Sequence, residues 1–413
     1  MIFLVAFLLE VFVLTVIEYY TWNTLYTPLV CLMLPYTAIL LLTLMVDGEL
    51  GFVPFNYESI IVWHVGLILF AIPSFCIGTA LKKMDVNIHP SPQELPVSKF
   101  QIGIATVLCL LFMWKLKSTL SSSTAFLGTD EFAEDFAGTG VWPHLREILM
   151  GLIIMFIYYL NRKRWWLMIL IVLMLIVQFL YMVKGSIIIA VCAGYLMRLY
   201  CGKSHLNLKI VLTVALSAFA VFILVYMVLP LMGNEKGEAD MQLFEFVIGH
   251  FMHYLTSGIL GWSYDVDMGI IDKGDISIIL SPFINLFNFA FGSSEPMLSP
   301  VNQFYYNTGI ALTNVRTFFG TLYIYTDYGQ FTLYALTISF LLYVLKAVSL
   351  ITNNIYLSFI LFYYCGLLAM GWFEFYFFHL SIIEVPVLIG MLAVISCIGK
   401  MIPNINIRWR ASR

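Results

Sequence analysis

The chain has 413 residues, of which 61% are hydrophobic, 16% aromatic and only 11% charged, with a formal net charge of −3 and a mean hydropathy of +0.93. These values lie far outside the usage of soluble globular proteins, and the charge balance gives no reason to expect a nucleic-acid partner. The sequence therefore predicts an all-α polytopic membrane protein.

Apolar runs long enough to cross a bilayer as helices recur along nearly the whole chain. About eleven spans of ~20 residues are expected: 2–20, 25–45, 59–81, 100–117, 145–161, 165–183, 186–200, 208–231, 318–345, 354–373 and 380–399. Residues 165–200 are too long for one crossing, so an outer hairpin is expected at Lys184, Gly185 and Ser186. Three regions follow: helices in 1–231, an outer cap loop in 232–317, and helices with a cytoplasmic tail in 318–413.

Lysine and arginine are retained on the cytoplasmic side when they lie in short loops. Basic residues in five alternate connections predict one cytoplasmic side: Lys82, Lys83, Lys99; Arg162, Lys163, Arg164; Arg198, Lys203, Lys209; Lys346; and Lys400, Arg408, Arg410, Arg413. The C-terminus is expected inside, and the N-terminus outside.

The cations that remain form a second set: Lys115, Lys117, Arg146, Lys184, Lys236, Lys273 and Arg316. Five of them fall at or near outer helix ends. Each could snorkel to the headgroups or pair with a local acid, as Arg146 with Glu147. As a set they fit an anionic lipid headgroup, with Arg316 the first choice because a guanidinium holds two phosphate oxygens. Lys184 and Arg146 are the other predicted pyrophosphate-binding residues.

The outer segment 232–317 is too long for a simple connector and too apolar for disorder. The stretches "MQLFEFVIGHFMHYLTSGILG" and "DISIILSPFINLFNFAFG" predict two interfacial helices, the second broken by Pro282. Carboxylates, amides and aromatic rings suit carbohydrate. The predicted catalytic residues besides Arg316 are Asp265, Asp267, Glu295 and Glu374, and the predicted sugar-binding residues are Tyr305, Tyr306, Asn314 and His379.

Metal chemistry has little support in the sequence. His250 and His253 lack a third ligand type, and the Asp265-x-Asp267 pair is common by chance, so no metal is predicted. Glu374 and His379 stand in the aromatic belt "MGWFEFYFFHLS", where membrane anchoring is the alternative to a chemical role. The seven cysteines lie in or beside apolar spans, and nucleotide-binding and hydrolase motifs are absent, so no cofactor is expected.

"TNVRTFFGTLYIYTDYG" before the ninth span, "KGSIIIA" in the middle hairpin and the large late outer loop resemble the Wzy-type oligosaccharide repeat-unit polymerases of bacterial O-antigen and capsule assembly. The resemblance covers most of the chain, although the glycine that some relatives carry eleven positions after the outer arginine is replaced by Asp327 here. It implies a multi-pass protein of the bacterial inner membrane that transfers a glycan from polyprenyl pyrophosphate to the hydroxyl of a second lipid-linked repeat unit.

The implied partners are polyprenyl-pyrophosphate-linked oligosaccharides and membrane lipid, and a chain-length regulator is left open as a further partner. Three alternatives remain: an O-antigen ligase or polyprenyl-phosphate-sugar glycosyltransferase, a transporter or flippase of lipid-linked sugars, and a purely structural scaffold, which the outer cations disfavour. No internal repeat supports transport, and a large outer cap is unusual for transporters.

Overall fold

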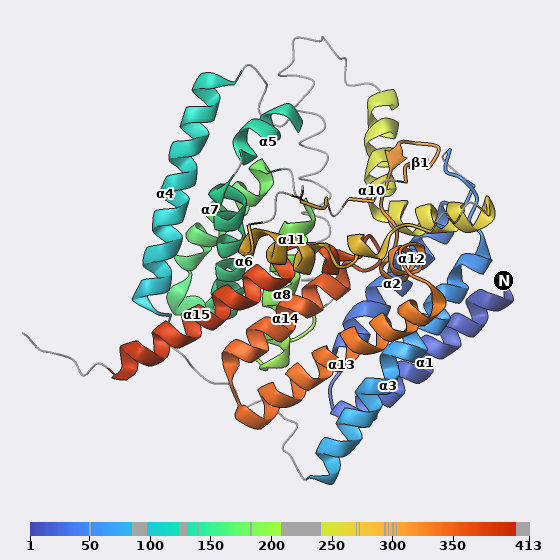
Figure 1. Cartoon of the computed structure of the whole chain (residues 1–413), viewed down its shortest axis with the longest axis horizontal. Helices are drawn as coiled ribbons and strands as arrows, with labels where there is room; N and C mark the ends of the chain where they lie inside the picture. The colour runs from blue at the N-terminus through green and yellow to red at the C-terminus, as the bar shows by residue number, and fades with distance from the viewer. Residues whose placement is uncertain are drawn as a thin grey trace, which may run out of the picture.

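The computed structural model describes residues 1–401 except 49–50, 85–96, 124–129, 139, 182–183, 208–240, 270, 272, 293–294, 296, 300 and 303. These residues form an all-α protein whose strands are one short antiparallel pair, β1 (Tyr306–Asn307) and β2 (Leu312–Thr313). The all-α part of the predicted fold class is therefore confirmed (Figure 1).

The helices of the first half are α1 (Ile2–Trp22), α2 (Pro28–Met45), η1 (Tyr57–Ile60), α3 (Ile61–Lys83), α4 (Lys99–Ser122), α5 (Asp130–Ala137), α6 (Val141–Tyr159), η2 (Arg162–Arg164), α7 (Leu167–Leu180) and α8 (Lys184–Tyr200). Those of the second half are α10 (Met241–Asp267), η3 (Ile276–Ile278), α11 (Ser281–Ala290), α12 (Phe318–Ile324), α13 (Tyr328–Thr352), α14 (Ile355–Ala369), η4 (Tyr376–Phe378) and α15 (Ser381–Met401).

The described residues contain six helices that are long and apolar enough to cross a membrane: Ile2–Trp22, Pro28–Met45, Tyr57–Lys83, Lys99–Ser122, Val141–Tyr159 and Tyr328–Thr352. Shorter apolar helices span Leu167–Leu180, Gly185–Tyr200, Ile355–Ala369 and Ser381–Ile395. The protein is thus a multi-pass membrane protein. The total of about eleven spans stays a prediction, since the span expected at 208–231 lies outside the described residues.

The hairpin expected within 165–200 is present as separate helices α7 and α8, but Lys184, Gly185 and Ser186, which were expected to form its turn, are the first residues of α8. The continuous span expected at 318–345 is wrong, because the chain forms α12 and then restarts as α13. Asp327 causes the restart: its carboxylate accepts from the Gln330 backbone amide at 2.7 Å, and the Gln330 side chain accepts from the Asp327 amide at 3.0 Å. This reciprocal capping box satisfies amides that a helix start leaves without partners.

Two groups of helices share the core. In the first, α3 packs between α1 and α13, and Gly66 allows the Phe319 ring of α12 to lie against the α3 backbone. In the second, α8 packs against α6 and α14, and Gly194 and Gly366 bring these backbones close. Small residues at helix contacts are typical of membrane bundles. Because α14 also packs on α2, the two groups form one bundle (Figure 1).

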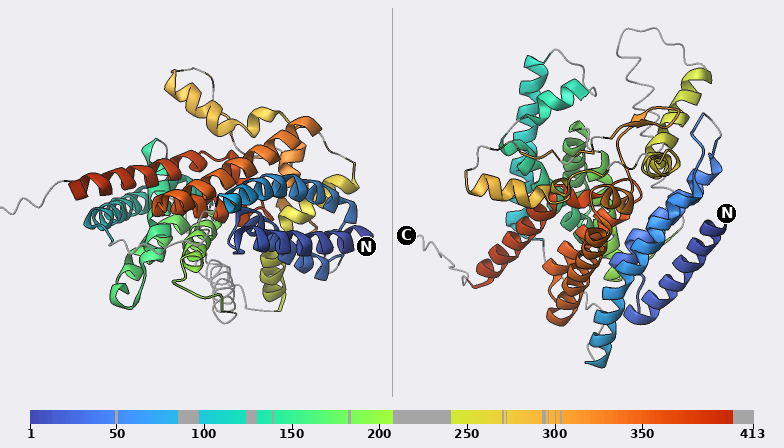
Figure 2. Two further views of the ribbon diagram at one scale, coloured as in Figure 1. Left: turned by 90° about the horizontal axis from the view of Figure 1, so that it is seen from below. Right: turned by 45° about the vertical axis from the view of Figure 1, so that its right-hand side comes forward.

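The outer segment contains α10 and α11, which fall on the two helical stretches expected there. Pro282 stands in the first turn of α11, so it starts this helix instead of interrupting a longer one. Figure 2 shows α11 on the outside of the bundle, where Phe283, Phe287 and Phe289 are exposed. An apolar exposed face of this kind is what a helix lying at a membrane surface presents.

Candidate functional site

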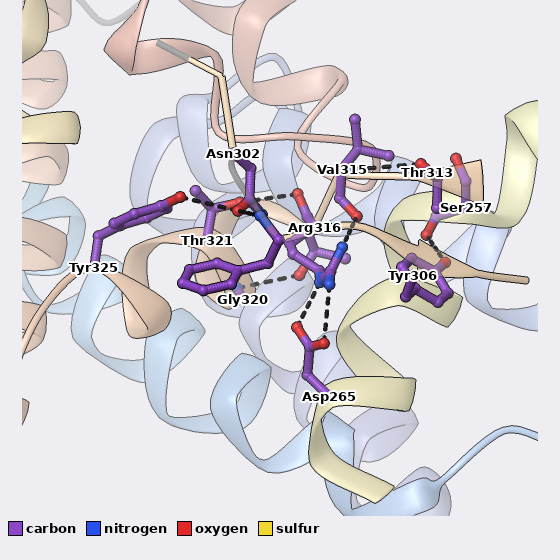
Figure 3. Close-up of polar contacts among 12 residues, drawn as sticks. Ser257, Asp265, Asn302, Tyr306, Thr313, Val315, Arg316, Gly320, Thr321 and Tyr325 are labelled. Carbon is purple, nitrogen blue, oxygen red and sulfur yellow. Dashed lines mark hydrogen bonds and ion pairs between the residues drawn. The ribbon is translucent and has the colours of Figure 1, made fainter. Parts of the chain in front are cut away.

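Arg316, the first choice from the sequence, lies just before α12 and is 1% exposed. Its Nε and Nη2 donate to the two carboxylate oxygens of Asp265 at 2.5 and 2.9 Å, and its Nη1 donates to the Val315 carbonyl oxygen at 3.2 Å. Asp265 is at the end of α10, so this fork joins the outer segment to the entrance of α12 (Figure 3). We call Arg316, Asp265 and Tyr306 the junction.

Tyr306 completes the junction from the short strand β1. Its ring centroid lies 4.6 Å from the Arg316 guanidinium carbon, and its hydroxyl donates to the Ser257 carbonyl oxygen at 2.6 Å. A side chain at Gly261 would collide with the Tyr306 ring and the Val315 carbonyl oxygen, so glycine allows α10 to approach this closely. Arg316 and Tyr306 are buried, both oxygens of Asp265 accept from Arg316, and a pyrophosphate would have to displace Asp265 to reach the guanidinium.

The other predicted residues of the outer segment do not gather around Arg316. Asp267 is exposed and accepts from the Asn56 side-chain amide at 3.3 Å, while Asn314 donates to the Asn302 carbonyl oxygen at 3.1 Å. Tyr305 and Glu295 are exposed on the surface. These four side chains do not form one site with Arg316.

The outer turn, residues 370–381, connects the junction with the second group of helices. On one side its Gly371 carbonyl oxygen accepts from the Phe318 amide at 2.6 Å, at the start of α12. On the other side the hydroxyl of Tyr376 lies so close to Gly185 that a Cβ there would be 2.4 Å away. The start of α8 is therefore placed against η4, while the side chain of Lys184, the first residue of α8, lies outside the described part of the structure.

Glu374 and His379 face each other within the outer turn, with 3.9 Å between Glu374 Oε2 and His379 Nε2. The His379 side chain is 34% exposed, and its ring centroid lies 5.6 Å from that of Tyr376. A partly exposed imidazole beside a carboxylate is the arrangement that general-base catalysis uses. The sequence named both residues but gave them separate tasks.

Arg146 lies near the start of α6 and is paired with its neighbour Glu147. This local ion pair is the alternative to lipid binding that the sequence offered. The Arg146 side chain is 18% exposed, and its Nε and Nη2 both donate to Glu147 Oε1, Nε at 3.1 Å. Two residues earlier in α6, His144 Nδ1 contacts Glu384 Oε1 of α15. The guanidinium carbon also lies 5.2 Å from the centroid of the Tyr181 ring.

Unlike the junction, the surroundings of Arg146 are incompletely satisfied. Seven buried side-chain nitrogen or oxygen atoms of the described residues have no hydrogen-bond partner, and four of them are here: Glu147 Oε2, Gln178 Oε1, Tyr181 Oη and Tyr363 Oη. Gln178 is tied to the group because its Nε2 donates to the Arg146 carbonyl oxygen at 3.0 Å. Buried polar atoms are normally satisfied, so this concentration marks the place as unusual.

Lys115 of α4 adds a second cation beside Tyr181. It is buried, its Nζ donates to the Ala137 carbonyl oxygen at 2.8 Å, and it lies 4.4 Å from the Trp142 ring centroid and 6.0 Å from that of Tyr181. We call this group the Tyr181 cluster; its members are Lys115, Trp142, Arg146, Glu147, Gln178 and Tyr181.

Sequence reasoning missed most of this cluster. Lys115 was one of the outer cations, but it received no role, and Gln178 and Tyr181 were not considered. A signal was present: Gln178 is the single polar residue of α7, "LMILIVLMLIVQFL", and Tyr181 follows it at the i+3 position of the same helix face.

A metal ion finds no ready-made ligand set in the described residues, which contain no group of three or more His, Cys, Asp or Glu side chains at suitable distances. His253 Nδ1 instead contacts Thr308 Oγ1 at 2.9 Å, and the ring centroids of His250 and His253 are 6.5 Å apart. Burial, together with the charge of His250, lowers the pKa of His253 to about 4. Neutral His253 fastens α10 to the β1–β2 turn.

A model described as "Family of unknown function (DUF6337)" matches residues 51–401, which include the junction, the outer turn and the Tyr181 cluster. Comparisons with curated proteins and with solved structures gave no match.

Proposed function

The chain belongs to the DUF6337 family, whose function is unknown, and we propose that it is a glycosyltransferase that polymerises lipid-linked oligosaccharide repeat units at the outer face of a bacterial inner membrane. The observation that carries the proposal is that the outer turn, with its Glu374–His379 pair, links the start of α8 to the start of α6. Tyr376 lies against Gly185 of α8, and Glu384, just after the turn, contacts His144, two residues before Arg146. The Wzy-type resemblance of the sequence supports the same reaction.

The reaction needs few protein groups. A hydroxyl of the acceptor repeat unit attacks the anomeric carbon of the donor glycan; a new carbon–oxygen bond forms, and the bond from that carbon to the pyrophosphate oxygen breaks. The polyprenyl pyrophosphate leaves with the bonding electron pair. The donor is already activated, so the protein has to stabilise the leaving group, remove one proton and orient two amphiphiles.

His379 is suited to accept the proton of the attacking hydroxyl, because it is the more exposed member of the pair, and Glu374 is placed to stabilise the imidazolium that results. Arg146 and Lys184 supply positive charge for the leaving group. Arg316 has a different task in this proposal: its bidentate contact with Asp265 holds the outer segment on the bundle.

The direct test is deletion of the gene in the organism that encodes the protein, followed by analysis of its surface polysaccharide. We expect the ladder of polymer lengths to collapse to single repeat units that are exposed at the outer face of the membrane. Single units that accumulate only at the inner face would support the transport alternative, and an unchanged ladder would refute the proposal.

A further inference from the structure

The Tyr181 cluster contains a buried positive charge that the described residues do not neutralise. The Lys115 ammonium has three donors, and the described part of the chain gives it one acceptor, the Ala137 carbonyl oxygen, together with the ring faces of Trp142, Phe136 and Tyr181. No carboxylate of the described residues forms an ion pair with it, unlike Arg146 and Arg316. Since buried charges are normally paired, we expect an anion to bind beside Lys115.

The same cluster offers acceptors that an anion cannot use. Glu147 Oε2 and Gln178 Oε1 are buried, and each lacks a donor in the described structure. Glu147 Oε2 belongs to the carboxylate that pairs with Arg146, and Gln178 Oε1 is an amide oxygen, so both are acceptors of hydrogen bonds. Hydroxyl groups would satisfy them, whereas a phosphate dianion would be repelled by Glu147.

The cluster thus requires two chemical properties in one ligand: a negative group for Lys115 and Arg146, and neutral hydroxyl donors for Glu147 and Gln178. The Tyr181 hydroxyl, which also has no partner, can donate to the first or accept from the second. The Trp142 and Tyr181 rings can cover the apolar face of a sugar. A sugar attached to a phosphate has all of these features.

We propose that the Tyr181 cluster binds the glycosyl phosphate portion of a lipid-linked saccharide, with the phosphate between Lys115 and Arg146 and the first sugar on Glu147 and Gln178. This inference rests on the proposed function, because it identifies part of that reaction's substrate. Trp142 and Arg146 are only half-buried, so the cluster is accessible from the protein surface, where such a headgroup would enter.

The test is a binding measurement that does not depend on polymer formation. The full-length chain, purified into lipid nanodiscs, is titrated calorimetrically with farnesyl phosphoryl glucose, farnesyl phosphate and glucose 1-phosphate. We expect farnesyl phosphoryl glucose to bind about tenfold more tightly than farnesyl phosphate, which lacks the sugar hydroxyls. Glucose 1-phosphate will bind more weakly if the natural ligand is a lipid headgroup; equal affinity would identify a free sugar phosphate as the source.

Tyr181→Phe is the sharpest variant, since it removes only a hydroxyl that has no partner in the protein. We expect it to weaken the binding of farnesyl phosphoryl glucose about tenfold while leaving the melting temperature unchanged or higher. Lys115→Met should weaken the binding of farnesyl phosphate and of farnesyl phosphoryl glucose alike. Tyr200→Phe, at the far end of α8, serves as the control and should bind like the wild type.

Unchanged affinity in Tyr181→Phe and Lys115→Met, or no binding of any probe by the folded wild type, would overturn the inference and leave buried water as the partner of these atoms. A failure of the proposed function is distinguishable: binding would persist, with the hydroxyl-dependent pattern intact, in a protein whose deletion leaves the polysaccharide ladder unchanged.

Discussion

The junction and the Tyr181 cluster each bury an arginine–carboxylate pair, but the two pairs differ in how completely they are satisfied. In the junction both oxygens of Asp265 accept from Arg316. In the Tyr181 cluster both donors of Arg146 converge on one oxygen of Glu147, and the other oxygen has no partner. We call a pair closed when both carboxylate oxygens accept hydrogen bonds, and open when one of them has no partner. A closed pair is suited to hold structure, and an open pair is suited to receive a ligand.

The two arginines exchange the roles that the sequence predicts for them. The sequence favours Arg316 because its position before an apolar stretch and its fork suit pyrophosphate. Its 1% exposure and its bidentate carboxylate contact favour a structural role, and they move the binding role to the half-buried Arg146. An arginine binds phosphate less readily when a carboxylate of the protein already accepts from its donors.

The largest effect is expected at the junction. Arg316→Ala leaves Asp265 buried without its partner, which costs about 3–5 kcal/mol and should reduce the amount of folded protein in the membrane. The double variant Arg316→Met/Asp265→Leu removes both charges, and it should recover both protein level and polymer length. Thermal unfolding measures the folded protein, and polysaccharide gels measure the polymer length. If the double variant is stable but makes no polymer, Arg316 has a direct role in the reaction.

A smaller effect, on activity alone, is expected at the outer turn, which contacts the starts of α12 and α8. His379→Asn removes the proposed base and should lower the polymerisation rate about a hundredfold, the lower end for general-base catalysis. Its melting temperature should change little, because the side chain is one-third exposed. Glu374→Gln should have a weaker effect in the same direction. Wild-type rates in both variants would exclude the pair from the chemistry.

The open pair can be tested with a conservative change. Arg146→Lys keeps the charge near Glu147 but loses the planar fork, so we expect about a tenfold loss of polymerisation rate at normal protein level. Arg198→Lys is the matched control, since Arg198 donates to carbonyl oxygens of Ile157, Tyr158 and Leu160 at the other end of α6. An equal loss in both variants would show that only helix packing was disturbed.

The smallest effect concerns the acid stability of the outer segment. The pKa of His253 is lowered to about 4 by burial, below the value of about 6.5 for an unfolded chain. Folding therefore disfavours its protonated form, so stability is complete above pH 6.5 and is lost as the pH falls toward 4. We expect a loss of about 1 kcal/mol at pH 5.5. His253→Gln should flatten this dependence in thermal unfolding, whereas an unchanged profile would contradict the assignment.

The sequence predicts the helical content and the division of residues 165–200 into α7 and α8, because hydropathy acts over short stretches of chain. It places Pro282 inside a helix, whereas this proline stands in the first turn of α11. It did not predict the capping box at Asp327, which splits a hydrophobic run that is otherwise continuous. Asp327 and Gln330 are the local signal of a helix start, but the hydropathy of residues 318–345 favours one continuous helix.

The candidate sites depend on contacts between distant residues, and this limits what sequence alone can assign. Arg316 and Asp265 were both named as site residues, but their pairing across 51 positions could not be inferred. Arg146 and Gln178 meet only because α6 packs on α7. A polar residue in an apolar helix, such as Gln178, is a sequence signal that indicates a functional site.

The most direct test of the central claim is reconstitution of the reaction. Purified protein in liposomes is supplied with a polyprenyl-pyrophosphate-linked repeat unit of the host, and both glycan length and released polyprenyl pyrophosphate are measured by mass spectrometry. We predict a ladder of glycan lengths, with one polyprenyl pyrophosphate released per linkage formed, and strongly reduced formation of both products by His379→Asn. Folded wild-type protein that yields neither longer glycans nor released polyprenyl pyrophosphate would contradict the account.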